Sequence, residues 1–363
     1  MSAPAVKAPK FGISFSFQVH RALGETWDKS YRENIELAAE ASRLGFDSIW
    51  VSEHHGEADG YCPSPIVAGA ALATAAPNCR IGQAVALAPL HGHPLRMAED
   101  LSVLDNLSGG RVEIGLGQGY RPAEFDMFGW NYKLRSRAFE ESLDILERAW
   151  TGELFDYQGR VYQVKGGVLR PPPVKPGKLP LWVGAAAPKA RARAVRHGAG
   201  LIVAPLIELE HLVRQLKSFD EEVARQGVKR LPHALMREIL VGDTPADAIA
   251  RHKAPLDHVY RVQYAPERVG LTRVDPATGE RKPVKNDDPY YLSEAFMQER
   301  WFLGPPADIA RKIVEWQPRL ALEHLICTPR SPGMPLKQAV GDLEAIAKGV
   351  IPAVRRAFSP ASA

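Results

Sequence analysis

The chain is short of cysteine, of excess charge and of long apolar runs. Its 363 residues include three cysteines, Cys62, Cys79 and Cys327. They form no CxxC pair, so the sequence predicts neither a disulfide framework nor a structural zinc site and favours a cytoplasmic location. The formal net charge is +4, without a long block of one sign, which argues against nucleic acid or an anionic membrane as the main partner.

Neither a membrane span nor a targeting segment is expected. The longest weakly polar run, Ile66–Ala76, is shorter than the roughly 20 residues needed to cross a bilayer. Residues Met1–Lys10 lack the apolar core of a signal peptide. Hydrophobic residues make up 45% and charged residues 24% of the chain, as in packed globular proteins. We expect one α/β domain over residues 1–363.

Segments with strand-like and helical periodicity alternate along the chain. The eight units predict a (β/α)8 TIM barrel with insertion segments, because right-handed parallel crossovers close at that count. In unit seven the helix begins at Thr244 and Pro245, and Pro305–Trp316 is expected as an additional helix before unit eight. The expected strands are Phe11–Phe17, Ser48–Ser52, Ile81–Ala84, Val112–Leu116, Leu181–Val183, Leu201–Val203, His233–Val241 and His324–Cys327.

One long segment departs from this alternation. Residues Pro255–Met297 are rich in proline, glycine and charge and show no clear apolar periodicity. A loop of this length in a compact domain is usually functional or mobile, so we interpret residues 255–297 as an active-site lid, with a passive insertion as the alternative. Its tyrosines, among them Tyr260 and Tyr264, would offer an aromatic surface to a substrate, and Arg268 could meet an anion or be a solvated loop charge.

Histidines and a carboxylate stand where the second and third strands end. The second strand leads into Ser52-Glu53-His54-His55 and the third into His91-Gly92-His93-Pro94. Active sites of such barrels lie at these strand ends. The side chains could serve as general acids or bases, as hydrogen-bond donors or as metal ligands. For the second pair, histidines that only cap helix ends are the alternative.

Three features further along the chain predict an anionic ligand. The fourth strand ends in alternating glycines from Gly115 to Gly119, which permit close backbone approach but lack the GxGxxG spacing of a dinucleotide turn. Arg137 lies at a helix start, where a cation is unfavourable unless an anion is near. Small residues at Gly184–Ala187 precede another helix start, whose amides can bind phosphate. Together they suggest a phosphorylated cofactor, with a surface salt bridge and tight packing as the alternatives.

Several short motifs occur together in this chain. They are Trp50–His55, His93–Asp100, Leu104–Arg111, Gly115–Tyr120, Arg137 before Phe139-Glu140-Glu141, Trp182–Gly184 and Leu303–Pro306. With them the chain resembles the bacterial-luciferase-like flavin monooxygenases over nearly its whole length. The resemblance implies a TIM barrel with insertions, often a homodimer, that works with reduced FMN delivered by a separate NAD(P)H:flavin reductase.

The resemblance also implies roles for individual residues. His54 matches the active-site histidine that supports the flavin peroxide, and His93 matches a second pocket histidine. Ala84 and Val85 match the place of a non-prolyl cis peptide that supports the isoalloxazine ring. The implied catalytic residues are His54 and His93, the implied cofactor-binding residues are Ala84, Gln118, Gly119, Tyr120, Arg137, Gly184, Ala185 and Ala186, and no metal ligand is expected.

Two positions depart from the luciferase pattern. Gly117 stands where luciferase itself has a reactive cysteine, so light emission from an aldehyde is not expected. Ala185 and Ala186 replace an acidic-hydroxyl pair, so phosphate contacts would depend more on the backbone.

The favoured function is a monooxygenase that uses reduced FMN and dioxygen on a small organic substrate. One alternative is a deazaflavin-dependent oxidoreductase of the same fold. Others are a metal-dependent TIM-barrel hydrolase and a flavin-binding barrel without catalysis. Against the hydrolase, the last strand ends in Leu325–Thr328 without the carboxylate that such a metal site normally needs.

Overall fold

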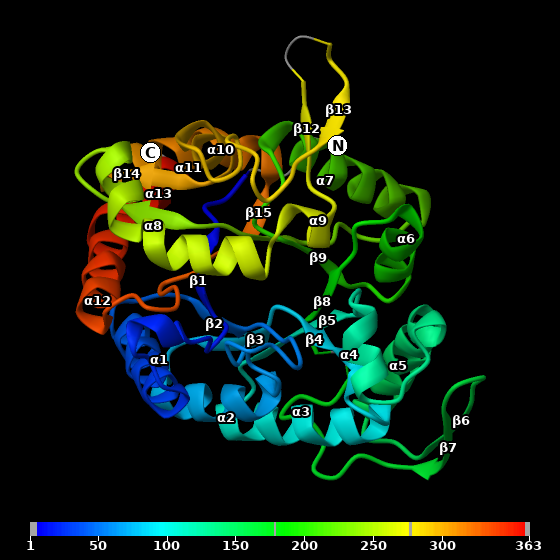
Figure 1. The fold of residues 1–363 in the computed structure, drawn as a ribbon. Helices are drawn as coiled ribbons and strands as arrows, with labels where there is room; N and C mark the ends of the chain where they lie inside the picture. Colours follow the sequence, from blue (N-terminus) through cyan, green and yellow to red (C-terminus); the bar gives the residue numbers. More distant parts are fainter. Residues whose placement is uncertain (1–5, 178, 276–277, 360–363) are drawn as a thin grey trace.

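A barrel of parallel strands lies at the centre of the molecule, with helices around it (Figure 1). The computed structural model describes residues 6–177, 179–275 and 278–359. Strand β1 pairs with β2 and β15, and the pairing of β3 with β5 closes the ring, which confirms the predicted (β/α)8 TIM barrel. The barrel strands are β1 (Lys10–Phe15), β2 (Ser48–Val51), β3 (Arg80–Gln83), β5 (Val112–Gly117), β8 (Leu181–Gly184), β9 (Gly200–Val203), β10 (His233–Met236) and β15 (Leu322–Cys327).

The outer helices bury one face each against the strands. Apolar side chains of the strands, such as Phe11 and Ile13, pack with those of the helices, such as Leu37 and Leu143, in the main core. This is the arrangement expected when helices with one apolar stripe cover a parallel sheet. The helices are α1 (Trp27–Arg43), α2 (Pro65–Ala75), α3 (Pro94–Ser108), α5 (Arg135–Ala149), α6 (Pro188–Arg196), α7 (Leu209–Arg225), α11 (Pro306–Leu320), α12 (Leu336–Ala345) and α13 (Ile351–Ala357).

The seventh helix of the ring is not the one expected. Helix α8 (Pro245–Val262) starts at the predicted cap Thr244, but it contacts β11 (Ile239–Val241) and β14 (Phe302–Gly304), which pair outside the barrel. Helix α11, expected as the additional helix, contacts α7 in the ring. Both helices begin with proline in the first turn, so these local signals predict where each starts and not which of them joins the ring.

Two indole rings fill the interior of the barrel. Trp50 and Trp182 have ring centroids 6.2 Å apart with planes at 81°, and they cluster with apolar residues of β9, β10 and β15. Trp182 Nε1 donates to Glu113 Oε2 at 2.7 Å. A Cβ added at Gly82 would lie 2.3 Å from Trp50 Cε3, so glycine makes room for the indole. Because the interior is filled, a ligand site belongs at the strand ends.

The insertions lie between barrel elements. Short strand β4 (Ala86–Leu87) follows β3, α4 (Pro122–Met127) follows β5, and the hairpin of β6 (Phe155–Gln158) and β7 (Gln163–Gly167) follows α5. The longest insertion runs from β11 to β14, between β10 and α11, and also contains α8, α9 (Pro266–Val269), β12 (Thr272–Val274), β13 (Arg281–Pro283) and α10 (Glu294–Arg300). Figure 1 shows the β6–β7 and β12–β13 hairpins extending away from the barrel.

The predicted lid, Pro255–Met297, falls inside this longest insertion. It is more regular than expected, because its first residues continue helix α8 through Pro255. Tyr260, Tyr291 and Phe296 are buried in an apolar cluster of their own with Trp301. The charge-rich composition obscured this second cluster, whose aromatic residues are spread over more than one element. Residues 276–277 of the segment lie outside the described ranges.

Within the described residues, no helix is both long enough and apolar enough to cross a bilayer. The sequence prediction for Met1–Lys10 concerns a segment of which residues 1–5 lie outside the described ranges.

Candidate active site

His54 lies just after β2 and pairs with a carboxylate from the α4 insertion. Its Nδ1 is 2.7 Å from Oε1 of Glu124, and the same oxygen accepts the backbone N–H of His55 at 3.1 Å. The imidazole edge meets the rings of Tyr61 and Tyr120, with centroids 4.8 and 5.7 Å away. The side chain of His54 is 13% exposed and that of Glu124 is 3% exposed. The imidazole is therefore held on several sides and still reaches the surface of the site.

The protonation of this pair follows from burial and from the hydrogen bond. Burial lowers the pKa of His54 below its usual value, although Glu124 acts in the opposite direction. Burial alone would raise the pKa of Glu124, but the hydrogen bonds that it accepts lower it overall. Both directions favour an ionised Glu124 beside a neutral His54. Neutral His54 then donates Nδ1–H to Glu124, and its Nε2 lone pair has no hydrogen-bond partner among the described residues.

Glu53, His55 and His91 form a second buried cluster. Glu53 carboxylate oxygens lie 2.6 Å from Nε2 of His55 and 2.9 Å from Nε2 of His91, and one of them accepts the Leu87 N–H at 2.8 Å. Burial would raise the pKa of Glu53, but the two histidines lower it to about 2. Burial would likewise lower the pKa of His91, but Glu53 outweighs it and raises that pKa. These groups satisfy one another and connect β2 to β4, so they support the site next to His54.

His93 makes different contacts. Its Nδ1 accepts the N–H of Leu95 at 3.1 Å and caps helix α3, and its Nε2 lies 3.2 Å from the carbonyl oxygen of Gln163 in β7. No contact between described residues joins it to His54, so the two histidines implied as catalytic are not brought together. In the described part of the chain, no group of three His, Cys, Asp or Glu side chains is placed to hold a metal ion.

The Ala84–Val85 peptide bond is cis, as the resemblance implies. Several glycines give the chain room around it. A Cβ at Gly115 would lie 1.8 Å from the carbonyl oxygen of Gln83, and a Cβ at Gly117 would lie 2.8 Å from Val85 Cγ2. At Gly184 a Cβ would be 3.9 Å from the same Val85 methyl group. The ends of β3, β5 and β8 therefore meet here, and Gly115 and Gly117 are needed for strand packing before any ligand is considered.

Arg193, in the last turn of α6, makes few hydrogen bonds. Arg193 Nη1 is 3.3 Å from Oε1 of Gln118, which also accepts the hydroxyl of Ser136 at 2.9 Å. Arg193 Nε is buried and has no hydrogen-bond partner among the described residues, although it lies 4.0 Å from Oε2 of Glu140 in a long ion pair. Helix α6 has no side-chain cap and no acidic residue in its first turn. Helix amides together with such a guanidinium suit a phosphate group.

Arg193 was not predicted from the sequence, because nothing distinguishes it from the other arginines of its helix. Arg137, which was predicted, lies exposed in the first turn of α5. Burial lowers the pKa of Arg193; Glu140 acts in the opposite direction, and Arg196 and Arg137 lower the pKa further. Ala185 is buried and Ala186 is exposed just before the start of α6. The structure therefore brings Gln118 to Arg193 and leaves Arg137 exposed in the first turn of α5.

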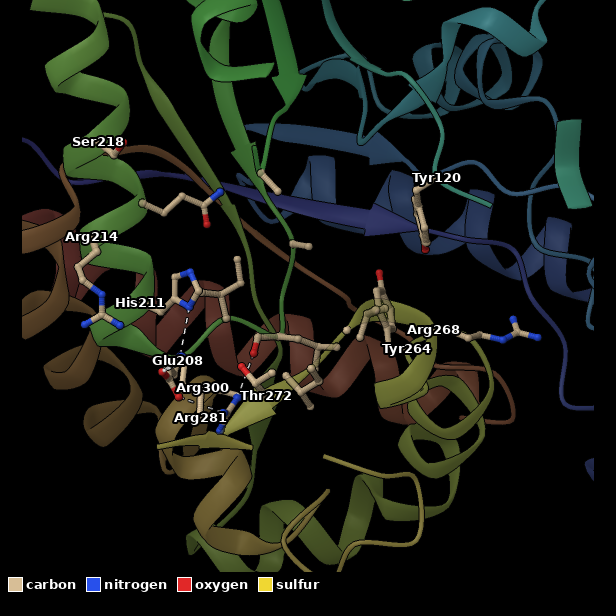
Figure 2. A pocket seen from close by; sticks show the side chains of 18 of the residues that line it. Tyr120, Glu208, His211, Arg214, Ser218, Tyr264, Arg268, Thr272, Arg281 and Arg300 are labelled. Atoms are coloured by element: carbon tan, nitrogen blue, oxygen red, sulfur yellow. Dashed lines mark hydrogen bonds and ion pairs between the residues drawn. The ribbon is translucent and has the colours of Figure 1, made fainter. Parts of the chain in front are cut away.

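A cavity of about 750 Å³ lies between α7 and the longest insertion. Ala186, Tyr120 and Tyr264 are among its lining residues. Figure 2 shows Tyr120 and Tyr264 on one side with their hydroxyl groups pointing toward each other, and several charged side chains on the other. Gly119, with a φ of 75°, directs the chain into Tyr120. His54 is not itself among the lining residues, but its ring contacts that of Tyr120, which therefore connects the imidazole to the cavity.

The insertion is attached to the loops that follow β2 and β5. Arg121 donates to Oε1 of Gln263 at 2.9 Å and forms an ion pair with Glu57. Gln263 is buried, and its Nε2 lies 3.5 Å from Oδ2 of Asp59. Arg268 lies 3.4 Å from Glu57. These contacts hold the insertion over the strand ends near His54.

Residues 10–323 match the luciferase-like monooxygenase family. The chain belongs to this family. The relatives of this luciferase-like chain include the uncharacterised protein y4vJ of Sinorhizobium fredii, which is 32% identical over 193 residues, 53% of this chain and 55% of the relative. They also include the oxygenase component of the flavin-dependent trigonelline monooxygenase of Acinetobacter baylyi, 29% identical over 248 residues, 65% of this chain and 67% of the relative. The match thus spans about half of the first relative's length and two thirds of the second's.

Solved structures share the fold of this luciferase-like chain. Monooxygenase RslO1 from Streptomyces bottropensis has a TM-score of 0.80 at 22% identity, over 94% of this chain and 99% of that one. The oxygenating constituent of 3,6-diketocamphane monooxygenase of Pseudomonas putida, in complex with FMN, has a TM-score of 0.75 at 20% identity, over 96% and 99%. An F420-dependent secondary alcohol dehydrogenase has a TM-score of 0.72 at 18% identity, over 96% and 99%. Family membership and the Acinetobacter relative support an oxidoreductase.

Proposed function

We propose that this chain is the oxygenase component of a two-component monooxygenase, which uses reduced FMN and dioxygen to oxidise a small organic molecule. The observation that carries the proposal is the His54–Glu124 pair, which leaves Nε2 of a neutral imidazole free beside the cavity that Tyr120 lines. The relative named as the oxygenase component of a flavin-dependent monooxygenase supports it.

The residues at the strand ends fit the parts of FMN. Val85, between the glycine-rich ends of β5 and β8, offers an apolar support for a flat ring. Gln118, Arg193 and the amides at the start of α6 would hold the phosphate. Reduced FMN, when bound, supplies the electrons that activate dioxygen. His54 keeps its proton on Nδ1 and can accept another at Nε2, while the insertion limits access of water.

The first test changes His54. We expect His54→Ala to bind reduced FMN as tightly as wild type does. The rate of substrate oxygenation should fall, and bound flavin should reoxidise without oxidising substrate, because a general acid or base typically contributes about 10² to 10⁴ in rate. Stopped-flow reoxidation of the bound reduced flavin measures this effect. Reoxidation that is unchanged from wild type would show that His54 is structural.

His93→Ala is the matched comparison. The helix cap that His93 provides predicts a loss of stability, about 0.5–2 kcal/mol for a cap in general, with unchanged reoxidation. Altered reoxidation at preserved stability would instead support the catalytic role implied by the resemblance.

The second test concerns the phosphate. FMN should bind more tightly than riboflavin, and Arg193→Gln should reduce this preference about tenfold or more, because a charge-assisted hydrogen bond contributes roughly 1.5–3 kcal/mol. Fluorescence titration with both flavins measures the preference. Arg137→Gln tests the predicted but exposed arginine, and a larger effect there would place the phosphate at the start of α5 instead.

A deazaflavin-dependent oxidoreductase is the second candidate, because the F420-dependent dehydrogenase shares the fold. Binding of F420 in preference to FMN, in the same titration, would favour it. The reductase partner, the homodimer, the cytoplasmic location and the single domain over residues 1–363 stay predictions.

A further inference from the structure

We propose that the cavity beside His54 binds an elongated organic anion, with its carboxylate or phosphate at the arginine-rich end and its reacting end at Tyr120 and Tyr264. The inference rests on the proposed function and specifies the class of its substrate.

The charge of the cavity is unbalanced. Its described lining includes five arginines, Arg191, Arg214, Arg268, Arg281 and Arg300, and the carboxylate of Glu208. That carboxylate is already shared, since its oxygens lie 2.6 Å from Arg281 and 3.5 Å from Arg300. Carboxylates outside the lining pair with two of these arginines, Glu57 with Arg268 at 3.4 Å and Glu299 with Arg300 at 2.8 Å. In Figure 2, the side chains of Arg214, Arg281 and Arg300 lie on the side opposite Tyr120. Arg191 and Arg214 are therefore the lining arginines without a carboxylate partner among the described residues, and an anion would balance their charge.

Arg191 gives the strongest sign of a ligand. It is 9% exposed, and its guanidinium donates to the carbonyl oxygen of Ala186 and, at 3.2 Å, to the hydroxyl of Ser218. No carboxylate of the described chain lies within 4.0 Å of it. Buried charged groups are nearly always paired, because an unpaired one loses its hydration without compensation. A buried guanidinium without an ion-pair partner, on the wall of a cavity, therefore indicates an anion-binding site.

Helix α7 supplies the next part of this site. His211, Arg214, Gln215 and Ser218 all line the cavity, at spacings of three and four residues that place them on one face of the helix. Arg214 has no ion-pair partner among the residues that the structure describes. Burial lowers the pKa of His211, and Arg281 and Arg214 lower it further. Glu208 acts in the opposite direction without outweighing them, so the imidazole lies in a net positive potential.

The rest of the cavity fits the remainder of such a molecule. Leu206, Ile207 and Leu271 are apolar lining residues. At the far end Tyr120 lies 5.7 Å, between ring centroids, from His54. The proposed phosphate site of FMN adjoins this one at the start of α6, since Ala186 lines the cavity, but it uses a different arginine. Arg193 contacts Gln118, whereas Arg191 contacts Ser218 of α7. Two arginines of one helix thus serve two anions.

The test compares ligands that differ in charge and little in shape. Octanoate, octyl phosphate and octanamide are titrated into the full chain without flavin, by isothermal calorimetry. We expect one of the two anions to bind about tenfold or more tightly than the amide, as a charge-assisted hydrogen bond would give. Tighter binding of octanoate assigns the site to a carboxylate, and tighter binding of octyl phosphate assigns it to a phosphate.

Variants then locate the anion. Arg214 is exposed and has no ion-pair partner among the described residues, so we expect Arg214→Gln to leave the stability of the chain unchanged. The variant should reduce the preference for the anion over the amide about three- to tenfold. Arg191→Gln should reduce it more. Arg268→Gln removes the same charge from the tyrosine end and should leave the preference unchanged.

Two results would overturn the proposal. One is octanamide binding as tightly as both anions. The other is an Arg214→Gln variant that loses FMN affinity as much as anion affinity, since the cluster would then hold the cofactor. A failure of the proposed function is distinguishable, because it appears as absent FMN binding in the wild-type chain, measured separately from these titrations.

Discussion

At the scale of single residues, the site depends on which nitrogen of His54 carries the proton. Glu124 accepts from Nδ1 and thereby directs the free lone pair to Nε2. A carboxylate 70 positions away in the sequence thus sets the chemistry of an imidazole at the end of β2. The arrangement has a clear consequence for titration.

We expect His54 to titrate below its usual value of 6.5, because burial disfavours the cation. The negative charge of Glu124 raises the pKa of His54, so Glu124→Gln should move the titration to still lower pH. Any rate that needs neutral Nε2 would then persist to lower pH in the variant. NMR titration of the imidazole protons, with His54→Asn to assign the resonance, measures both midpoints. A wild-type midpoint above 6.5, or one that Glu124→Gln leaves in place, would contradict this account.

At the scale of secondary structure elements, the longest insertion combines a buried part and an exposed part. Tyr260, Tyr291 and Phe296 form an apolar cluster, whereas the strand residues of β13 are exposed. Between them, Tyr264 and Leu271 line the cavity. We therefore expect the buried cluster to stay ordered without ligand, and the cavity-lining residues Tyr264 and Leu271 to become more ordered when a ligand binds.

The lid interpretation therefore predicts a difference in hydrogen exchange. Amides of α8 and α10 should be protected without ligand, and those of Tyr264–Thr272 should gain protection when FMN and octanoate are both added. Exchange followed by mass spectrometry resolves these segments. Full protection of Tyr264–Thr272 in the free chain would make the segment a passive insertion.

Local signals predicted the elements better than their partners. Most strands were recognisable because each is a short apolar run before a helix, and the motif at Trp50–His55 placed His54 at a strand end. The expected strand His233–Val241 is instead two strands, β10 in the barrel and β11 in a separate sheet with β14. Helix α8 was assigned to the ring because its cap resembles that of any barrel helix. Glu124 and Arg193 were missed, since each looks like an ordinary charge on a helix and its role depends on a contact with a distant segment. Such contacts arise from the tertiary fold and produce no periodic pattern in the amino-acid sequence.

At the scale of the whole molecule, the predicted homodimer has a candidate face. Helices α2 and α3 contact each other and expose apolar side chains, among them Val67 at 70% and Leu107 at 61%. Large exposed apolar side chains on adjacent helices are candidates for a protein–protein contact. A second copy of the chain would cover them.

Light scattering should then give twice the mass of one chain, and Leu107→Lys should weaken the dimer about tenfold or more, as loss of a buried apolar contact of roughly 1.5–3 kcal/mol implies. Leu154 is 73% exposed and lies beside the β6–β7 hairpin, so Leu154→Lys is a matched control that should have no effect. A monomeric wild-type chain, or equal effects of the two variants, would rule out this face.

The two indole rings inside the barrel also provide a spectroscopic signal, in the near ultraviolet, of whether the barrel is packed. Trp50 and Trp182 are 0% and 3% exposed and lie at 81° to each other, so they form a rigid chiral pair of chromophores. Two indoles held in one fixed asymmetric arrangement should contribute to the near-ultraviolet circular dichroism of the folded chain. A compact state that kept its helices but lost its side-chain packing would lose that contribution and keep its far-ultraviolet spectrum. The chain thus carries an intrinsic optical reporter of its own barrel, which needs neither a cofactor nor a substrate.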